Sequence, residues 1–331
     1  MPPNVSEDYL ITERNRELPK LVAPQADDWK FQLSYSTVVF FGYFYLAALY
    51  GLYLCFTSAH WATIIFAAVL LEVGQIGVLA GAHRLWSHKS YEAKLPLQIL
   101  LIIFQSVSSQ WTAFNWVKEH RIHHEFSDTD ADPYNSTRGL FFSHVGWMLV
   151  NKHPELKKRR ACIDMSDMRR NPVVSFQYKY GFAFIATFAY IIPTLIPMYL
   201  WGETLMNAYF VNILRTIICQ NCTSLVNSFA HAYGNKPYDK NLTASENMLA
   251  HFGTLGEGFH NYHHVFPWDY RSSELGSSFN LPAAFIEFFA KIGWAYNLKT
   301  AEYSAVAKRA KRCGDGTFKE VDLKNEECKS E

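Results

Sequence analysis

Long uncharged stretches alternate with polar segments along the chain, and four of these stretches are long enough to cross a lipid bilayer. Two of the four carry no charged residue, and the other two carry one each, Glu72 and Arg215. A transmembrane helix needs about 20 mostly apolar residues. The pattern therefore predicts four transmembrane helices in two hairpins with short connectors, at residues 35–56, 61–82, 180–202 and 204–226.

A fifth uncharged stretch, residues 95–117, contains several Gln, Ser and Asn side chains and is interpreted differently. Polar side chains are costly in a helix that faces lipid. A full crossing would also separate the histidines before this stretch from those after it. We therefore expect a re-entrant or surface-lying helix beneath a cytosolic helical cap.

The basic residues mark which side of the membrane each segment occupies. Of the 31 Lys and Arg residues, all but Arg215 lie outside the four expected spans, and the short connectors contain none. Because basic loops remain in the cytosol, both termini are expected there. We expect a cytosolic segment at 1–34, a membrane domain at 35–311 with its cap at 83–179 and 227–311, and a flexible tail at 312–331. The first 30 residues lack the apolar core of a cleavable signal peptide.

Nine of the 13 histidines occur in four motifs whose spacing is typical of metal ligands. On a helix, positions i, i+3 and i+4 share one face, so each His-x-x-His-His motif directs three imidazoles to one region. Nine imidazoles exceed the needs of one ion and indicate two. The motifs are HRLWSH (His83, His88), HRIHH (His120, His123, His124), NSFAH (His231) and HNYHH (His260, His263, His264).

The cysteines help to choose the metal, because a structural zinc site would usually include them. All six lie outside the histidine motifs, so a redox-active pair of iron ions is preferred. Cys219 and Cys222 form a C-x-x-C in an apolar stretch and are expected to be free thiols.

Polar residues near these motifs are further candidates. Asn227 precedes His231 by one helical turn and could orient a ligand or a metal-bound water. Thr223, one turn earlier, could face the site or bond its own helix backbone. Gln110 and Trp116 could line the passage to the metals, although Trp116 could equally belong to the core.

Charged and deeper positions carry separate hypotheses. Lys118 and Glu119 flank the second motif and could contact a substrate headgroup. Leu71 and Gln75 lie near the helix face of His83, so they could close the deep end of a substrate tunnel. Glu72 and Arg215 are expected to pair with each other or with polar neighbours.

In this order, the motifs resemble those of the membrane acyl-CoA desaturases of the stearoyl-CoA type. The resemblance covers residues 29–311 and includes EFSDTDADPYNSTRG after HRIHH. It implies an all-α integral membrane enzyme of the endoplasmic reticulum with four spans and a cytosolic cap. It also implies two iron ions, O2 as co-substrate, cytochrome b5 with its NADH-dependent reductase as electron donor, and a bent tunnel for the chain of an acyl-CoA. No nucleic-acid partner is expected.

The resemblance also implies a role for each candidate residue. Asn227 would reach one iron through water, whereas Lys118 and Glu119 would lie near the CoA. The kink of the tunnel would be formed by Gln110, Trp116 and Thr223. The ligands of one iron would be His83, His88, His120, His124 and His263, and those of the other His123, His231, His260 and His264.

Within the family, the sequence resembles the insect branch and, more narrowly, the moth pheromone-gland enzymes. Residues 280–284, NLPAA, resemble the Leu-Pro-Ala-Gln signature of the Δ11 lineage but depart from it at the last position. Gln75 also departs, because relatives usually carry a small residue there. The expected reaction is Δ11 desaturation of palmitoyl-CoA, with Δ9 desaturation as the alternative.

Three other classes of membrane protein share some of these features. A membrane hydroxylase or alkane monooxygenase uses similar motifs, but NSFAH and HNYHH favour a desaturase. A front-end desaturase would usually carry a fused cytochrome b5 domain and Gln in place of His260. A metal transporter would place its ligands along a pathway through the spans rather than on one side.

Overall fold

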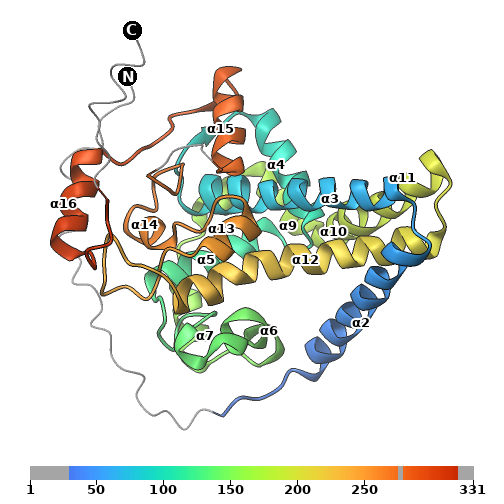
Figure 1. Ribbon diagram of the computed structural model, residues 1–331, viewed down its shortest axis with the longest axis horizontal. Helices are drawn as coiled ribbons and strands as arrows, with labels where there is room; N and C mark the ends of the chain where they lie inside the picture. Colours follow the sequence, from blue (N-terminus) through green and yellow to red (C-terminus); the bar gives the residue numbers. More distant parts are fainter. Residues whose placement is uncertain (1–29, 275–278, 320–331) are drawn as a thin grey trace.

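A computed structural model describes residues 30–274 and 279–319, and these form a helical protein with one short two-stranded sheet (Figure 1). The expectations for residues 1–29 and 320–331 lie outside the described residues. In Figure 1, α3 and α12 run side by side through the molecule, and α5, α13 and α14 gather near one end of this pair. This end positions the histidine motifs.

The predicted spans correspond to four helical segments. The first is α2 (Tyr35–Thr57), and the second is α3 (Trp61–Ile76), which continues as the π-helical η1 (Gly77–Ser87). The third consists of α10 (Gly181–Ile185), η4 (Ala186–Ile191) and α11 (Ile192–Trp201), and the fourth is α12 (Leu205–Ala232). Within the described residues, three helices are long and apolar enough to cross a membrane: Tyr35–Thr57, Trp61–Ser87 and Gly181–Trp201. Because α12 is more polar, its role as a fourth span stays a prediction.

The fifth apolar stretch, for which one re-entrant or surface-lying helix is expected, forms two helices instead. These are α4 (Leu95–Val107) and α5 (Ala113–Glu125). Between them, Ser109 and Trp111 have positive φ angles of 59° and 60°, which a helix cannot accommodate. The side chain of Gln105 donates to the carbonyl of Trp111 at 2.9 Å, which fixes the turn. The break redirects the chain so that α5 carries its histidines to the site.

Gly77, where η1 begins, explains how closely this helix approaches α4. A Cβ atom at Gly77 would lie 2.1 Å from the backbone nitrogen of Gln105, so no larger residue fits without a backbone shift. π-Helical turns are rare and are often found at functional sites. Here η1 contains His83 and ends at Ser87, directly before His88.

The two isolated charges of the apolar stretches do not pair with each other. Arg215 donates to Oδ1 of Asn212 at 2.8 Å and to the carbonyl of Ala189 at 3.0 Å. The predicted contact with a polar neighbour is therefore confirmed. The alternative partner, Glu72, contributes no ion pair among the described residues, and its Oε2 has no hydrogen-bond partner there.

The end of the bundle remote from the histidines is held by one carboxylate. Glu203, which is 4% exposed, accepts through Oε2 from the backbone of His60 at 2.9 Å and from Thr63 at 2.6 Å. Its Oε1 accepts from the backbone of Thr204 and from Asn207, both at 2.9 Å. Four donors on one carboxylate connect the two predicted hairpins at this end.

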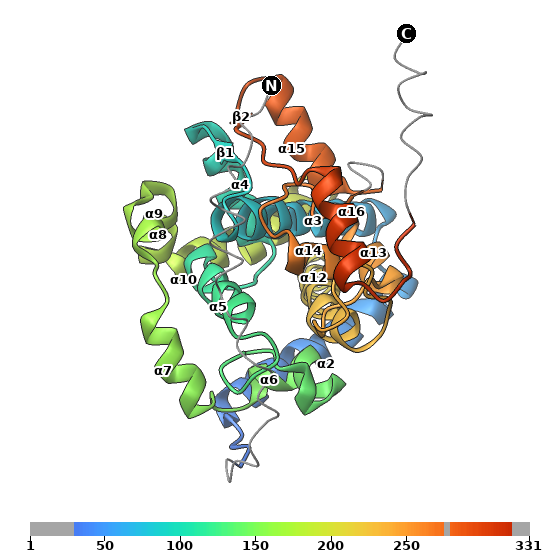
Figure 2. The same ribbon diagram turned by 90° about the vertical axis from the view of Figure 1, so that its left-hand side faces the viewer.

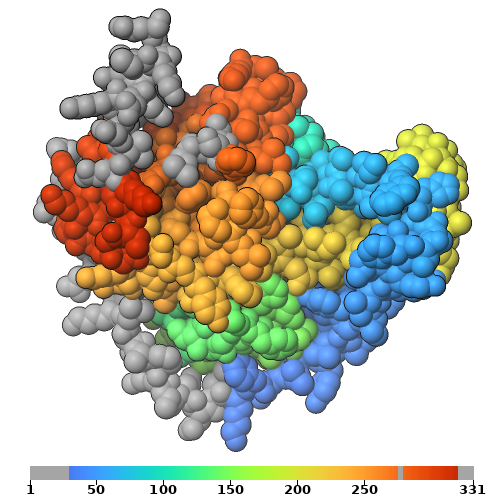
Figure 3. All heavy atoms as spheres, viewed as in Figure 1, coloured from blue at the N-terminus to red at the C-terminus, as the bar shows by residue number. Residues whose placement is uncertain are grey.

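The remaining elements form the cap, which Figures 2 and 3 show from two sides. Around the middle of the chain they are β1 (Glu92–Ala93), η2 (Ser136–Arg138), η3 (Phe142–Gly146), α6 (Trp147–Leu149), α7 (Pro154–Cys162), α8 (Ser166–Arg170) and α9 (Pro172–Lys179). Toward the C-terminus they are α13 (Met248–Thr254), α14 (His260–Val265), α15 (Leu281–Lys291), β2 (Ala295–Tyr296) and α16 (Tyr303–Cys313).

The first residues of the predicted tail contact the cap. Helix α16 extends to Cys313, and the ring of Phe318 lies 5.8 Å from that of Tyr238. The backbone of Lys236 also donates to Asp315. The flexibility of the tail stays a prediction.

Candidate metal centre

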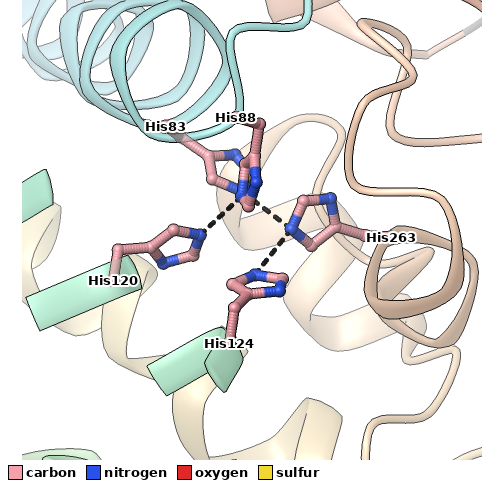
Figure 4. Close-up of side chains that lie close together, drawn as sticks. All are labelled: His83, His88, His120, His124 and His263. Atoms are coloured by element: carbon pink, nitrogen blue, oxygen red, sulfur yellow. Dashed lines mark hydrogen bonds between the residues drawn. The ribbon is translucent and has the colours of Figure 1, made fainter. Parts of the chain in front are cut away.

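Five histidines from three segments converge on one point (Figure 4). Their ring nitrogens all lie within 4.8 Å of one another. The Nε2 atoms of His83 and His263 are 3.0 Å apart, and those of His88 and His120 are 2.8 Å apart. The Nε2 atom of His124 lies 3.0 Å from that of His263. His120 and His124 are one turn apart on α5, so they share a helix face.

The other four histidines form a second group, with ring nitrogens again within 4.8 Å of one another. The Nε2 atom of His260 lies 3.0 Å from those of His231 and His264. His123 completes the group, and its buried Nε2 has no partner among the described residues. Together the two groups contain all nine predicted ligands, divided as the family resemblance implies.

These residues fit a pair of metal ions with nitrogen ligands. Two nitrogens at right angles, each about 2.1 Å from an ion, lie roughly 3 Å apart, which is the spacing of the Nε2 pairs. Neutral imidazole is the form that binds metals. Burial lowers the pKa of six of these rings well below the usual value, so they are neutral at physiological pH: His88, His120, His124, His260, His263 and His264.

Three carboxylates lie behind the ligands and hold the other ring nitrogen. Nδ1 of His231 lies 2.8 Å from Asp128, and Nδ1 of His123 lies 2.9 Å from Asp132. Although burial opposes it, Asp132 raises the pKa of His123. Such partners fix ring orientation and strengthen the ligand. The histidine motifs alone did not identify Asp128 and Asp132, although both follow HRIHH within eight residues and could have been considered as partners of the histidines.

The third carboxylate, Glu257, lies beneath the first group. Its Oε2 is 3.3 Å from Nδ1 of His83, and its Oε1 accepts from Nη2 of Arg84 at 2.5 Å. Burial alone would raise the pKa of Glu257, but Arg84 and His83 outweigh it and lower the pKa to about 2. Glu257 therefore stays ionised and can orient His83.

An apolar cavity of about 500 Å³ adjoins the histidines and contains most of the remaining predicted site residues. Gln110, Trp116, Thr223 and Asn227 all line it, together with the ligand His120. Gln110 donates to Oγ1 of Thr223 at 2.8 Å and accepts from Nε1 of Trp116 at 3.3 Å. These hydrogen bonds join three lining residues along the cavity wall, which also contains the ligand His120.

The remaining four predicted site residues differ in whether they line the cavity: Glu119, Lys118, Leu71 and Gln75. Glu119 lines the cavity but is 1% exposed and pairs with Arg160 at 2.8 Å, so it is a buried ion pair. Lys118 is half-buried and does not line the cavity. Leu71 and Gln75 are also absent from its lining, because the wall on that side comes from other helices. The structure therefore does not bring these two to the cavity.

The two cysteines of the C-x-x-C are free, as predicted. Cys219 is buried and Cys222 is half-buried. Nε2 of Gln110 lies 3.7 Å from Sγ of Cys219, so this thiol packs against the cavity wall. Burial suits a structural thiol better than a reactive one.

Three described helices could cross a membrane, and two groups of buried or half-buried histidines lie beside an apolar cavity. These features define a membrane protein with a candidate dinuclear metal centre. The model of the family described as fatty acid desaturase matches residues 59–297. The chain belongs to this family.

Relatives with known activities are similar over nearly the whole chain. An acyl-CoA Delta(11) desaturase of Choristoneura rosaceana is 56% identical over 96% of this chain and 95% of its own length. An acyl-CoA Delta(11) desaturase of Spodoptera littoralis is 54% identical over 93% of this chain and 91% of its own. An acyl-CoA Delta-9 desaturase of Acheta domesticus is 49% identical over 89% of this chain and 84% of its own.

Proposed function

We propose that this protein, an acyl-CoA desaturase, introduces a double bond at the Δ11 position of palmitoyl-CoA. The observation that carries the proposal is the apolar cavity whose wall contains His120 of the first histidine group and Asn227, one helical turn before His231 of the second group. The Δ11 desaturases of two moths, at 56% and 54% identity, support the position of the bond. The 49% identical Δ9 desaturase of a cricket makes Δ9 the second candidate.

Two iron ions are the proposed cofactor, and the histidine groups would each hold one. When bound, the irons supply the redox chemistry that reduces O2 and removes two hydrogen atoms from the chain. The reaction balances if O2, two electrons and two protons accompany each desaturation and two waters leave. Cytochrome b5 with its reductase is the proposed electron source, as the family resemblance implies.

The protein's own residues determine which carbons react. The hydrogen-bonded chain of Trp116, Gln110 and Thr223 fixes the cavity wall next to His120. An acyl chain held against this wall would present a short segment to the metals, since proximity and orientation govern such reactions. Asn227, on the same wall, would hold a water between its side chain and the second histidine group. The apolar lining would exclude other water.

The CoA is proposed to lie on the cap, near Lys118 and the basic run Lys157–Arg160. Phosphate groups are bound by Lys and Arg side chains. Arg160 is already paired with Glu119, and this pair borders the cavity. Glu119 would therefore act by positioning Arg160, whose guanidinium group would face the CoA.

The proposed arrangement in the membrane follows from charge and hydrophobicity. Four spans, α2, α3–η1, α10–η4–α11 and α12, would cross the endoplasmic reticulum membrane, with both termini and the cap in the cytosol. The break between α4 and α5 would make this segment re-entrant.

Expression in a desaturase-deficient yeast tests the function directly. Cells would be fed labelled palmitate, and the products would be analysed by gas chromatography with mass spectrometry of disulfide adducts. Labelled Δ11-hexadecenoate is expected. Labelled Δ9 product alone would overturn the assigned bond position, whereas hydroxylated product would overturn desaturation itself.

A further inference from the structure

The cavity beside the histidines extends to the flank of the helical bundle. One wall of this flank is formed by α2 and the opposite wall by α10 and η4, while α12 lies between them. The wall residues are Phe40, Phe41 and Phe44 on α2, and Phe182, Ile185, Ala186 and Tyr190 on α10 and η4.

Several cavity-lining side chains are also exposed on the outside of the protein. Phe182 is 91% exposed and Phe40 is 53% exposed. These two residues lie on opposite walls and belong to helices that are long and apolar enough to cross a membrane. The same side chains thus border both the cavity and the lipid-facing surface, which defines a slot between the two walls.

Aromatic rings from both walls line this slot. The rings of Phe44 and Tyr190 meet across it, 5.9 Å apart and nearly edge to face. The hydroxyl of Tyr190 lies 2.6 Å from Oγ of Ser109, so its polar atom has a partner. The slot therefore presents apolar groups to lipid without a costly unpaired polar atom.

The slot lies near the first residues of the helices that form its two walls. Helix α2 begins at Tyr35 and α10 at Gly181, so Phe40 and Phe182 both lie close to helix starts. Those starts follow basic segments and are the ends that the charge pattern places next to the cytosol. A headgroup could remain at that surface while its chain lies in the slot.

We propose that the slot between α2 and α10–η4 is a lateral portal for the acyl chain. The chain of acyl-CoA would pass from the cytosolic leaflet into the cavity, and the unsaturated chain would return the same way. This inference rests on the proposed function. Threading a long chain from the cytosolic cap would expose it to water at each methylene, whereas sideways transfer keeps it in apolar surroundings.

Substitutions at two alanines of the same helical segment test the portal. Ala186→Trp fills the slot, because Ala186 lines the cavity. Ala183→Trp adds the same bulk at an exposed position that does not line it and is the matched control. Association of palmitoyl-CoA would be followed by stopped-flow tryptophan fluorescence in proteoliposomes. We expect the association rate to fall at least about ten-fold in Ala186→Trp and to stay within about two-fold of wild type in Ala183→Trp.

Wild-type protein gives a second test that no folding defect can obscure. At a constant aqueous concentration of palmitoyl-CoA, a change in lipid composition alters the partition coefficient and therefore the mole fraction of palmitoyl-CoA in the bilayer. The association rate should follow the mole fraction. A rate that follows the aqueous concentration, or equal rates in the two variants, would overturn the portal. Wild-type protein that yields no desaturated product would instead overturn the proposed function.

Discussion

Asp128 lies 2.8 Å from Nδ1 of His231, although 103 residues separate the two along the chain. Thr243 contributes a further hydrogen bond to the same carboxylate oxygen. Although burial opposes it, the contact with His231 keeps the pKa of Asp128 far below its usual value. Nε2 of His231, on the other side of the ring, is thereby directed at His260.

This contact predicts that Asp128→Asn weakens metal binding without removing a ligand. Loss of a carboxylate partner typically lowers metal affinity by about 10- to 100-fold. Iron content and activity should be measured after dialysis against graded chelator. Asp130→Asn is the control, because Asp130 pairs with Arg138 instead of a histidine. Equal metal loss in both variants would contradict the role of Asp128.

The nine grouped histidines should differ from the ungrouped ones. Alanine at any of the nine is expected to abolish product and remove about one ion per chain, because each group depends on all its ligands. His60→Ala and His251→Ala serve as controls. A sample loaded with zinc, which also favours imidazole, should be inactive. Full activity of His231→Ala would exclude the ninth ligand.

Thr223→Val should alter the position of the double bond. The substitution keeps the shape of Thr223 but removes a hydrogen-bond acceptor for Gln110, whose side chain also accepts from Trp116. We expect a second positional isomer and a rate lower by roughly 10- to 100-fold, since small misplacements are costly. Products would be resolved as disulfide adducts. Leu71→Ala, at a position that does not line the cavity, should leave the isomer ratio unchanged.

Protease protection tests the arrangement in the membrane. Tags at either terminus should be cleaved in intact microsomes, whereas a tag between residues 57 and 60 should be protected, because basic segments stay in the cytosol. Detergent should abolish the protection. Cleavage of the internal tag in sealed microsomes would require a different number of spans.

Acid should weaken the contact between α5 and α8 in a predictable direction. Burial opposes ionisation of Asp167, but hydrogen bonds from Arg121 and Lys89 hold its pKa well below the usual 3.8. A lowered pKa stabilises the fold above the unfolded-state value and loses this effect as pH falls below about 4. The stability difference between wild type and Asp167→Asn, measured by thermal unfolding, should therefore shrink from pH 7 to pH 3. A constant difference would contradict this assignment.

The sequence predicted the ligands well because their spacing is local. His120 and His124 share a helix face wherever α5 lies, so their convergence needed no tertiary information. The break before α5 was missed, because uncharged residues gave no sign of the positive φ at Ser109 and Trp111. Apolar stretches report burial, whereas this turn depends on a side-chain bond from Gln105 to a backbone carbonyl.

In contrast to the ligands, the residues that line the cavity could not be predicted from local spacing. Leu71 and Gln75 were assigned to the tunnel from one helix alone, through their distance from His83. Most of the lining comes from α2, α5, α10, η4 and α12, and their relative positions depend on packing between helices. Hydrophobic periodicity shows which residues are apolar, but it does not show which neighbour a helix faces in a multi-helix bundle.

Each metal group combines histidines from segments that the ribosome produces far apart in time. His83 is synthesised 180 residues before His263, yet their Nε2 atoms end 3.0 Å apart. Neither group can be complete until the C-terminal part of the cap has emerged and docked. Metal loading is therefore a late step of biogenesis. A shortage of the metal ion should increase the share of newly made chains that cellular quality control degrades.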